Sequence, residues 1–404
     1  PNGVRVTFDL QFFGAAERVT GSLYLLRAGQ SRIVLECGLV QGSPDEDARN
    51  REAFPFDVGE IDAVVISHSH IDHSGRVPLL VKQGYAGPIY THEASKALCE
   101  IMLPDSGYLN EKEAEWENRK RRRKGQPPVE PLYTQEDGEK CIERFRGVRY
   151  GTPTEIVPGL VLTYFDAGHI LGACIVQLDH TANGETRRLV FSGDLGFRDA
   201  PVMNPAFRPE HADAVLMEST YGDRLHRPIA ETLDELTEVF ETARAAQGNI
   251  LIPAFTVGRT QDLLHLMAEN YKRWNLDNWR IFLDSPMGIE ATEVYARFRH
   301  LYDTKLFGDG SDTPKLPNLH QTRTPEESMV INEVEAGAII IAGSGMCSGG
   351  RILHHLKHNV WRPQCHLVIV GFQAYGTLGR RLVDGAETIK LWGQDYRVQI
   401  QIHT

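Results

Sequence analysis

The chain has 404 residues, of which 41% are hydrophobic and 24% charged, as in an ordinary globular protein of one to three domains. No stretch approaches the roughly 20 apolar residues that span a bilayer, and the first ten residues lack the pattern of a signal peptide. The six cysteines form no CxxC pair, which excludes a thiolate zinc site and predicts free thiols in a cytoplasmic protein. The net charge of −11 means that a nucleic-acid partner needs a local basic patch. The unbroken basic run 119–124 is one, although a solvated helix end explains it equally well.

The first half of the chain predicts short strands separated by helices, from the alternation and length of its apolar runs. The predicted strands are residues 4–8, 22–27, 33–36, 63–66, 161–166, 174–179 and 189–192. The predicted helices are residues 75–83, 93–103 and 110–124. Two prolines at 127 and 128 prevent the last of these helices from continuing.

From about residue 213 the pattern becomes a regular alternation of strands and helices, which is typical of crossover units on a largely parallel sheet. The predicted strands are residues 214–217, 249–253, 281–284, 338–342 and 366–370. The predicted helices are residues 228–246, 260–272, 289–298 and 351–358. The segment Gly308–Pro317, rich in Gly, Asp and Pro, is expected to be a surface loop.

The segment Ser67–His73 places four candidate metal ligands within six residues, directly after an apolar run. Residues two apart on an extended stretch project to the same side, so His68 and His70 can aim at one metal ion from the end of a strand. Asp72 and His73 begin the next turn and point toward a second position beside the first. Imidazole nitrogens with one carboxylate oxygen suit Zn²⁺. A metal site explains this segment far better than a buried core does.

Two later segments have the right form to complete such a site. Asp166–His169 and Ser192–Asp194 each place a ligand just past an apolar strand and after a glycine, where the backbone can turn a side chain inward. We expect His169 to join the first two histidines on one metal ion. Asp194, with two carboxylate oxygens, is suited to bridge both ions.

These motifs resemble those of the metallo-β-lactamase superfamily and, more narrowly, its β-CASP branch, whose members process nucleic acids. The resemblance covers essentially the whole chain. Within this branch, the chain most resembles the bacterial and archaeal relatives of the endonuclease subunit of the pre-mRNA 3′-end cleavage factor. Beyond the candidate ligands it rests on Gly14–Ala16 with Val19–Ser22, Glu218–Gly222, Pro253–Arg259, Gly343–Arg351 and Gly371–Gly379.

The resemblance implies an α/β protein in which a four-layer αββα metallo-β-lactamase domain is interrupted by an inserted β-CASP α/β domain. The first domain is expected to comprise residues 1–208 and 386–404, and the second residues 209–385. Residues 388–390 and 397–403 are predicted to be strands of the chain's return to the first domain.

The resemblance also implies a zinc-dependent ribonuclease. Two Zn²⁺ ions would hold a hydroxide at neutral pH, and this hydroxide would attack the phosphodiester phosphorus. The implied metal ligands are His68, His70, Asp72, His73, His169 and Asp194. Catalysis is expected to depend on Asp72, which also orients the nucleophile, on His70, and on Glu218, whose motif helps to order the active-site histidines.

Substrate phosphates are expected to bind at the glycine-rich turn 343–351, which leads into a helix, and at arginines whose planar guanidinium matches phosphate. The residues that we expect to make these contacts are Arg259, Ser344, Gly345, Arg351 and Arg381.

The sequence departs from the family pattern at three places. Glu36 stands where the family usually has Asp, and Arg381 stands where the family often has a histidine, a candidate general acid. The family's motif C, a Ser-Ala-His segment that completes the second zinc site, is expected shortly after His403, whereas this sequence stops at Thr404. We expect the natural protein to continue; otherwise the second zinc site is incomplete.

Three functional hypotheses follow. The first is a ribonuclease acting on single-stranded RNA, either internally or as a 5′–3′ exonuclease, in RNA processing or decay. The second is a metallo-hydrolase of DNA or of a small-molecule ester, which the long inserted region disfavours for small substrates. The third is a degenerate, non-catalytic homologue, which the complete ligand set disfavours. A homodimer is also compatible, because dimers are common in the family and the basic run can serve an interface as easily as RNA.

Overall fold

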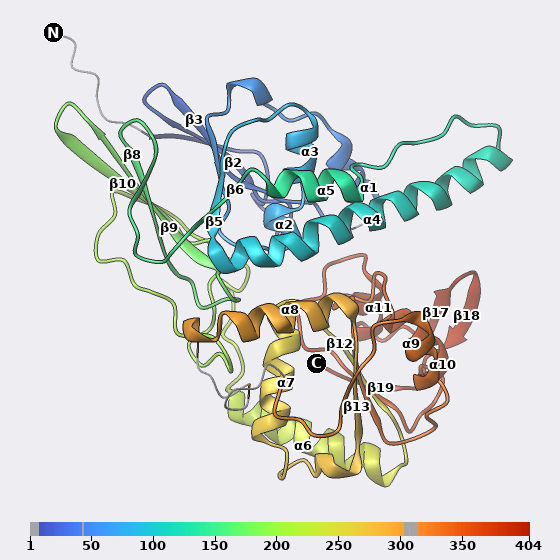
Figure 1. The fold of residues 1–404 in the computed structure, drawn as a ribbon. Helices are drawn as coiled ribbons and strands as arrows, with labels where there is room; N and C mark the ends of the chain where they lie inside the picture. Colours follow the sequence, from blue (N-terminus) through green and yellow to red (C-terminus); the bar gives the residue numbers. More distant parts are fainter. Residues whose placement is uncertain (1–7, 43, 303–306, 308–313) are drawn as a thin grey trace. The chain divides into compact units, whose positions relative to one another are not determined.

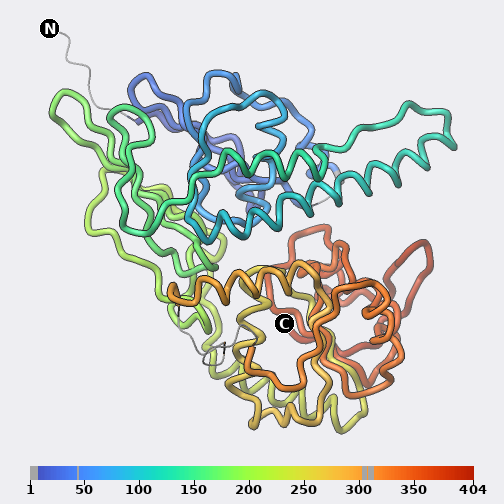
Figure 2. The backbone as a smooth tube through the Cα atoms, in the orientation of Figure 1, coloured from blue at the N-terminus to red at the C-terminus, as the bar shows by residue number. Residues whose placement is uncertain are grey.

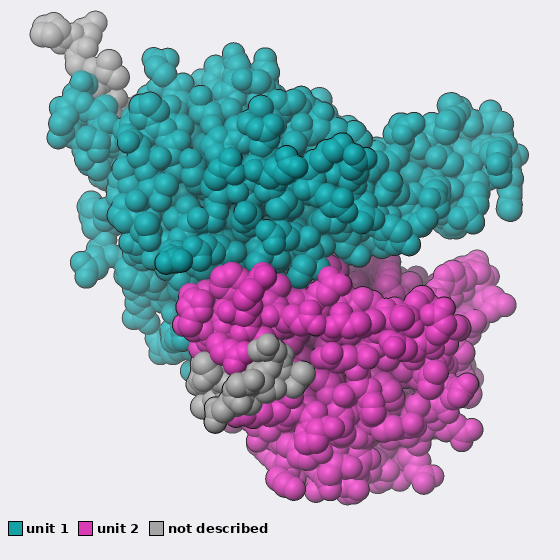
Figure 3. Space-filling model, in the orientation of Figure 1, with its two compact units in different colours: residues 1–222 teal, residues 223–404 magenta. Residues whose placement is uncertain are grey.

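The computed structural model describes residues 8–42, 44–302, 307 and 314–404. Most of the strand predicted at 4–8 and of the loop predicted at 308–317 therefore lies outside the described residues. The chain divides into two compact units, unit 1 (Pro1–Gly222) and unit 2 (Asp223–Thr404), coloured separately in Figure 3, and each is described by itself. None of the described helices is both long and apolar enough to span a membrane.

Unit 1 contains two β-sheets (Figure 1). The first has the order β1-β2-β3-β4-β5-β6, antiparallel from β1 to β3 and parallel from β3 to β6. Its strands are β1 (Phe8–Phe12), β2 (Leu23–Ala28), β3 (Ser31–Cys37), β4 (Ala63–Val65), β5 (Ile89–His92) and β6 (Phe145–Val148). The second sheet has the order β11-β10-β9-β8-β7. Its strands are β7 (Thr154–Val157), β8 (Leu160–Asp166), β9 (Cys174–Ala182), β10 (Glu185–Phe191) and β11 (Ala214–Leu216).

The first sheet is buried on both faces, because apolar residues of β2 point alternately to two different cores. Leu23 and Leu25 belong to a cluster shared with the helices, whereas Tyr24 and Leu26 belong to a cluster shared with the second sheet. This arrangement supplies one helical layer and the two sheet layers of the expected fold. The helices of unit 1 are α1 (Pro44–Ala48), α2 (Ile71–Ser74), α3 (Val77–Lys82), α4 (Glu93–Arg123) and α5 (Gln135–Ile142).

Helix α4 is a single continuous helix with Pro104 inside it, whereas the sequence predicted two helices, residues 93–103 and 110–124. Proline removes one hydrogen bond from a helix, but packing along both flanks here outweighs that loss. Gly107 is buried against α5, where a Cβ would approach the carbonyl oxygen of Thr134 to 2.3 Å. The missing side chain thus allows α4 and α5 to pack closely.

Unit 2 is built on one parallel sheet with the order β14-β13-β15-β12-β16-β19, as its strand–helix alternation predicted (Figure 2 follows the chain through it). The strands are β12 (Ile250–Pro253), β13 (Arg280–Asp284), β14 (Leu319–Gln321), β15 (Ala338–Ala342), β16 (His366–Val368) and β19 (Gln401–His403). The helices are α6 (Ile229–Ala245), α7 (Arg259–Glu269), α8 (Pro286–Arg297), α9 (Pro325–Ile331), α10 (Ile352–Asn359) and α11 (Leu378–Val383). Side chains of α9, α10 and α11 pack on one face of the sheet. The α/β class predicted from the sequence is confirmed.

Two segments lie in a different unit from the domain to which the sequence assigned them. Strand β11, expected in the second domain, pairs in parallel with β10 in unit 1. Residues 386–404, expected to return to the first domain, form the hairpin β17 (Thr388–Leu391) and β18 (Gln394–Arg397) and then β19, which pairs with β16 in unit 2. The domain division itself, with an interrupted first domain, stays a prediction.

Candidate metal centre

The candidate ligands of unit 1 all lie just past the ends of strands that belong to its two packed sheets. His68 and His70 follow β4 in the first sheet, and α2 begins directly after His70. His169 follows β8 and Asp194 follows β10, both in the second sheet. Because the two sheets share one core, the loops at these strand ends converge, which brings together residues more than a hundred positions apart in sequence.

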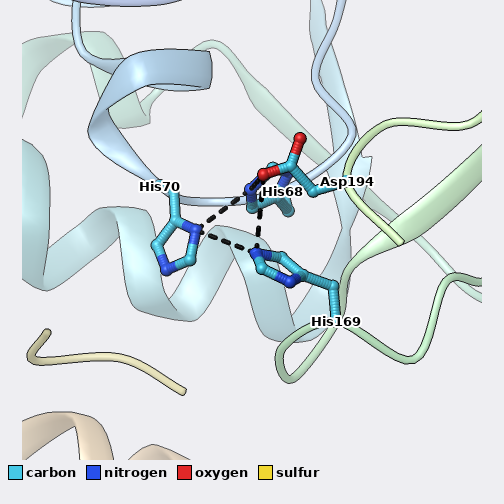
Figure 4. Close-up of side chains that lie close together, drawn as sticks. All are labelled: His68, His70, His169 and Asp194. Carbon is cyan, nitrogen blue, oxygen red and sulfur yellow. Dashed lines mark hydrogen bonds and ion pairs between the residues drawn. The ribbon is translucent and has the colours of Figure 1, made fainter. Parts of the chain in front are cut away.

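Four side chains form a first donor group: His68, His70, His169 and Asp194 (Figure 4). His70 Nδ1 lies 3.1 Å from His68 Nε2 and 3.2 Å from His169 Nε2. Asp194 Oδ2 lies 3.8 Å from His68 Nε2 and 3.6 Å from His169 Nε2. Four ligand atoms thus face one common centre, which is the arrangement of a metal site rather than of a hydrogen-bonded core.

A second donor group lies beside the first and shares Asp194 with it. Asp194 Oδ1 lies 3.2 Å from His73 Nε2, and Asp72 Oδ2 lies 3.7 Å from the same nitrogen. The two oxygens of Asp194 therefore point to different groups, Oδ2 to the first and Oδ1 to the second. One carboxylate placed in this way can bridge two metal ions.

The nitrogens of His68 and His73 that point away from the donor groups are held by Glu36 and Ser67. The Glu36 carboxylate accepts hydrogen bonds from Ser67 N at 2.5 Å, from Ser67 Oγ at 2.8 Å and from His73 Nδ1. Because the Ser67 hydroxyl gives its proton to Glu36, its oxygen accepts from His68 Nδ1 at 2.9 Å. His68 then carries its proton on Nδ1 and presents a free Nε2 lone pair to the first donor group. His73 donates from Nδ1 to Glu36 and places its Nε2 3.2 Å from Asp194 Oδ1.

Glu36 is therefore a positioning residue, although it is also close to His68 and His73 in a group that could hold a metal. Its side chain is fully buried, and its hydrogen bonds to Ser67 and His73 use its oxygens. Its backbone φ of 60° lies in the left-handed region that residues other than glycine rarely adopt. Such strain clusters at functional sites, and the Glu36 hydrogen bonds are what hold it here.

The charges of the centre are strongly coupled. Burial alone would lower the pKa of His73, but the carboxylates of Asp194 and Asp72 outweigh burial and raise that pKa well above its usual value. Burial would raise the pKa of Asp194, but the neighbouring His73 holds it well below its usual value. Burial, aided by the neighbouring His73, lowers the pKa of His68. Asp194 is thus a carboxylate, and His68 is a neutral imidazole suited to bind a cation.

The loop that carries Asp194 is fixed by Gly193 and Glu218. Gly193 has a φ of 54°, and a Cβ there would lie 2.8 Å from the Ser67 side chain, so only glycine lets the two ligand loops approach. Glu218 accepts a hydrogen bond from the Leu195 N–H at 2.9 Å, and its own N–H donates to Ser192 Oγ at 3.0 Å. These contacts of Glu218 support the Asp194 loop, whereas the sequence led us to expect support of the histidines.

The predicted phosphate-binding residues belong to unit 2, where Arg351 is engaged internally. Its guanidinium donates to Asp284 at 2.7 Å, to the Thr322 carbonyl at 3.0 Å and to the Arg323 carbonyl at 2.8 Å. The side chain of Asp284 is fully buried beneath it. Arg351 therefore ties the end of the glycine-rich turn to the neighbouring strand ends.

The other predicted phosphate-binding residues differ in how far contacts within the protein already occupy them. The Ser344 hydroxyl accepts hydrogen bonds from the Ser348 and Gly349 N–H groups and so closes the turn. Gly345 lies so close to Phe255 that a Cβ would approach it to 2.9 Å. Two arginines present more of their surface: Arg259, 3.4 Å from Asp262 at the start of α7, and Arg381, which is exposed on α11.

Two family models match this chain. The model of the metallo-beta-lactamase superfamily matches residues 16–254, and the model of the Beta-Casp domain matches residues 260–382. The chain belongs to the metallo-β-lactamase superfamily, in its β-CASP branch, as its motifs predicted. Membership implies an enzyme that uses a divalent metal ion, and the first donor group is a set of residues that could hold it.

Among curated proteins, the chain is similar to Ribonuclease TTHA0252 of Thermus thermophilus, with 37% identity over 97% of this chain and 85% of the relative. It is also similar to the Transcription termination factor FttA of Methanocaldococcus jannaschii and of Methanococcus maripaludis, with 30% and 31% identity. The matches cover 58% and 61% of those two factors, so the chain spans less than two thirds of their length.

The sequence-based reasoning found the ligands but missed the hydrogen bonds that orient them. Ser67 was noted only as the first residue of the ligand segment, yet it links Glu36 to His68. The position of Ser67, directly before the first ligand histidine and after an apolar strand, is a pattern that could have suggested this contact.

Proposed function

We propose that this protein is a zinc-dependent ribonuclease that hydrolyses the phosphodiester bonds of single-stranded RNA. The observation that carries the proposal is the pair of donor groups joined by Asp194. The chain has the β-CASP domain, and a protein to which it is similar is named a ribonuclease, which also supports the proposal. Two Zn²⁺ ions are proposed, one held by His68, His70, His169 and Asp194 and the other by Asp72, His73 and Asp194.

The donor set supports zinc. Ligand atoms about 2.0–2.1 Å from a tetrahedral zinc ion lie roughly 3.3–3.4 Å from one another. The four distances measured in the first group, from 3.1 to 3.8 Å, bracket that value. Three imidazole nitrogens and one carboxylate oxygen are ligands that zinc favours, and no thiolate is needed, since all six cysteines are buried free thiols.

Zinc bound here supplies Lewis-acid chemistry, activating water near neutral pH and neutralising charge on the phosphate oxygens. The protein's own residues fix the geometry in which that chemistry occurs. Asp72 is only partly buried, so its carboxylate is placed to orient the attacking water as well as to bind. Glu36 and Ser67 hold the histidines in the binding tautomer, and Glu218 holds the loop of Asp194.

For the substrate we propose Arg381 and Arg259 as phosphate contacts, because their guanidinium groups are more exposed than that of Arg351 and make fewer contacts within the protein. The turn of Ser344 and Gly345, together with Arg351, is then the frame that fixes the glycine-rich loop. We also propose a cytoplasmic location, in keeping with the free thiols. A homodimer stays a prediction.

Cleavage of a 5′-labelled single-stranded RNA by the complete gene product tests the proposal. We expect fragments with zinc present, none after chelation or with the variant His70→Ala, and recovery of the parent activity when zinc is restored. Fragment lengths separate internal cuts from 5′–3′ trimming. Intact RNA in the presence of a protein with two bound zinc ions would contradict the proposal. Parallel assays with DNA of the same sequence and with an activated ester then decide between the other substrates and a non-catalytic role.

A further inference from the structure

The second half of α4 leaves the body of unit 1 as a projecting arm (Figure 1). One side of this arm is covered by the chain segment that returns from it. Asn118 exchanges two hydrogen bonds with Val129, at 2.7 and 2.9 Å, and Arg121 donates to the Pro127 carbonyl at 2.6 Å. Ala114 is buried on the same side. The arm therefore has a defined inner side, and its opposite side is outward.

The outward side carries a regular row of side chains, which we name the outer stripe. Its residues recur every three or four positions, so at 3.6 residues per turn they fall within a sector of about 80°. All of them are exposed; the first four alternate between aromatic and basic types, and the fifth is basic. The outer stripe consists of Tyr108, Lys112, Trp116, Arg119 and Arg123.

Charge is sorted between the outer stripe and the rest of the arm. The acidic residues Glu111, Glu113, Glu115 and Glu117 lie outside the sector of the stripe. Glu111 accepts a hydrogen bond from the Gln135 N–H on the inner side, and Glu115, at the edge of the sector, forms an ion pair with Lys112 at 3.0 Å. Within the part of the chain that the structure describes, no ion pair joins Arg119 or Arg123 to a carboxylate. Two guanidinium groups at the outer end of the stripe are thus left to meet an anion.

The two aromatic side chains of the outer stripe are largely exposed to solvent. Trp116 is 56% exposed and Tyr108 is 44% exposed. The Lys120 ammonium lies 2.9 Å from the centre of the Trp116 ring, so a further cation flanks this indole. Tyr108 and Trp116 are eight residues apart, which places them about 12 Å apart along the helix.

We propose that the outer stripe of α4 binds single-stranded RNA outside the metal centre, with bases stacked on Trp116 and Tyr108 and phosphates bound by Arg119 and Arg123. Interleaved aromatic and basic side chains are the pattern of surfaces that bind single strands without reading their sequence. This inference rests on the proposed function, because RNA becomes a partner of this chain through it. A protein partner fits less well, because the stripe has three cations and no aliphatic residue.

Affinity for RNA, measured separately from cleavage, tests the inference. The probe is a fluorescein-labelled oligouridine of about 20 nucleotides, longer than the roughly 4–16 nucleotides that one OB fold occupies. Binding is measured by anisotropy over a range of salt concentrations, with the complete protein in its His70→Ala form so that the probe stays intact. The variants are Trp116→Ala and the double variant Arg119→Glu with Arg123→Glu. The control of equal charge is Arg27→Glu with Lys272→Glu, both of them exposed residues that are not part of α4.

We expect Trp116→Ala to weaken binding at least fivefold and the arginine double variant to weaken it at least tenfold, with the control unchanged. The slope of log affinity against log salt should fall by about 0.7 for each phosphate contact that is lost. Far-ultraviolet circular dichroism checks that α4 remains folded in each variant.

Three results would overturn the inference: equal affinity in the variants and the control, no binding of the probe by the parent protein, or a change of oligomeric state in the variants with unchanged RNA affinity. The last result would mean that the stripe binds a second copy of the chain rather than RNA. If the arm variants bind normally but the wild-type protein cleaves RNA, only this inference fails. If the arm binds RNA but the wild-type protein cleaves none, the inference stands and the proposed function fails.

Discussion

The metal centre of unit 1 and the Asp284 network of unit 2 use the same kinds of side chain with opposite results. Asp284 is fully buried, and each of its two oxygens accepts hydrogen bonds from side chains around it. The donors are Thr322, Ser328, Arg351 and His355, at 2.6 to 2.7 Å. In the metal centre, three imidazole nitrogens face one another and Asp194 without such a set of donors between them.

The comparison shows how to interpret a buried Asp–His pair. If every acceptor atom around the pair has a hydrogen-bond donor, the pair has a structural role; if acceptor atoms outnumber donors, the pair is suited to bind a metal ion. Around Asp284 they match, so the carboxylate stays charged and its pKa is held below the usual range despite burial, by His355 and its other donors. In the metal centre, the Nε2 lone pair of the neutral His68 is a surplus acceptor, and a cation is what would satisfy it.

The largest effect is expected from Asp194→Asn, which breaks the link between the two donor groups. An amide has one acceptor oxygen, so it can serve one group but not both. Metal centres contribute several kcal/mol to the transition state, so we expect cleavage to fall by about 100- to 10,000-fold. Metal analysis should show less than the wild-type zinc content. Asp9→Asn, on the exposed part of β1, is the control, and wild-type zinc content in Asp194→Asn would contradict the bridging role.

The next largest effect is expected from Asp284→Asn, which should lower stability without removing metal. Loss of one partner from a buried ion pair costs about 3–5 kcal/mol, which thermal unfolding would register as a lower midpoint. Because the pKa of Asp284 is lowered by folding, its contribution is present above about pH 4 and is lost as the pH falls further. The difference in stability between wild type and variant should therefore shrink below pH 4. An equal difference at pH 3 and pH 7 would show that this carboxylate is not held charged.

A smaller effect is expected from Glu36→Gln, which keeps size but removes the charge that orients His73. Changes at residues that orient metal ligands typically cost 10- to 100-fold in metal affinity or activity, and we expect that range here. Zinc titration with a competing chelator measures it, with the exposed Glu52→Gln as the control. Glu36→Asp, which keeps the charge and gives the residue usual in the family, should retain more affinity than Glu36→Gln. The reverse order would show that side-chain length rather than charge sets the contact.

The helices and strands were predictable where the local pattern of apolar residues determines them, and less predictable where contacts between distant segments determine them. Strands β12, β13, β15 and β16 of the parallel sheet in unit 2 were found because they are apolar runs between helices, as at 338–342, whereas β14 (Leu319–Gln321) was missed. Helix α5 and strands β5, β6 and β7 were missed, because each is short and only partly apolar. Helix α4 was predicted as two helices, residues 93–103 and 110–124, because a local pattern does not contain the packing that makes the helix continuous.

In the site, the sequence revealed the ligands but not their partners. Closely spaced histidines such as His68 and His70 are visible because their side chains lie near each other in sequence. The hydrogen bonds of Arg351 with Asp284 join residues 67 positions apart, and no local pattern contains them. The sequence therefore could not distinguish an arginine free to bind phosphate from one used to hold a turn.

The smallest and most specific effect is expected from two buried serines on either side of His68. The Ser67 hydroxyl links Glu36 to His68, whereas within the described part of the chain the Ser69 hydroxyl has no hydrogen-bond partner. Ser67→Ala should weaken zinc binding about fivefold, the equivalent of one hydrogen bond worth about 1 kcal/mol. Ser69→Ala, equally buried, should leave zinc affinity unchanged. If both variants lose affinity equally, packing of the ligand loop rather than the hydrogen bond orients His68, and the tautomer argument for the metal centre is wrong.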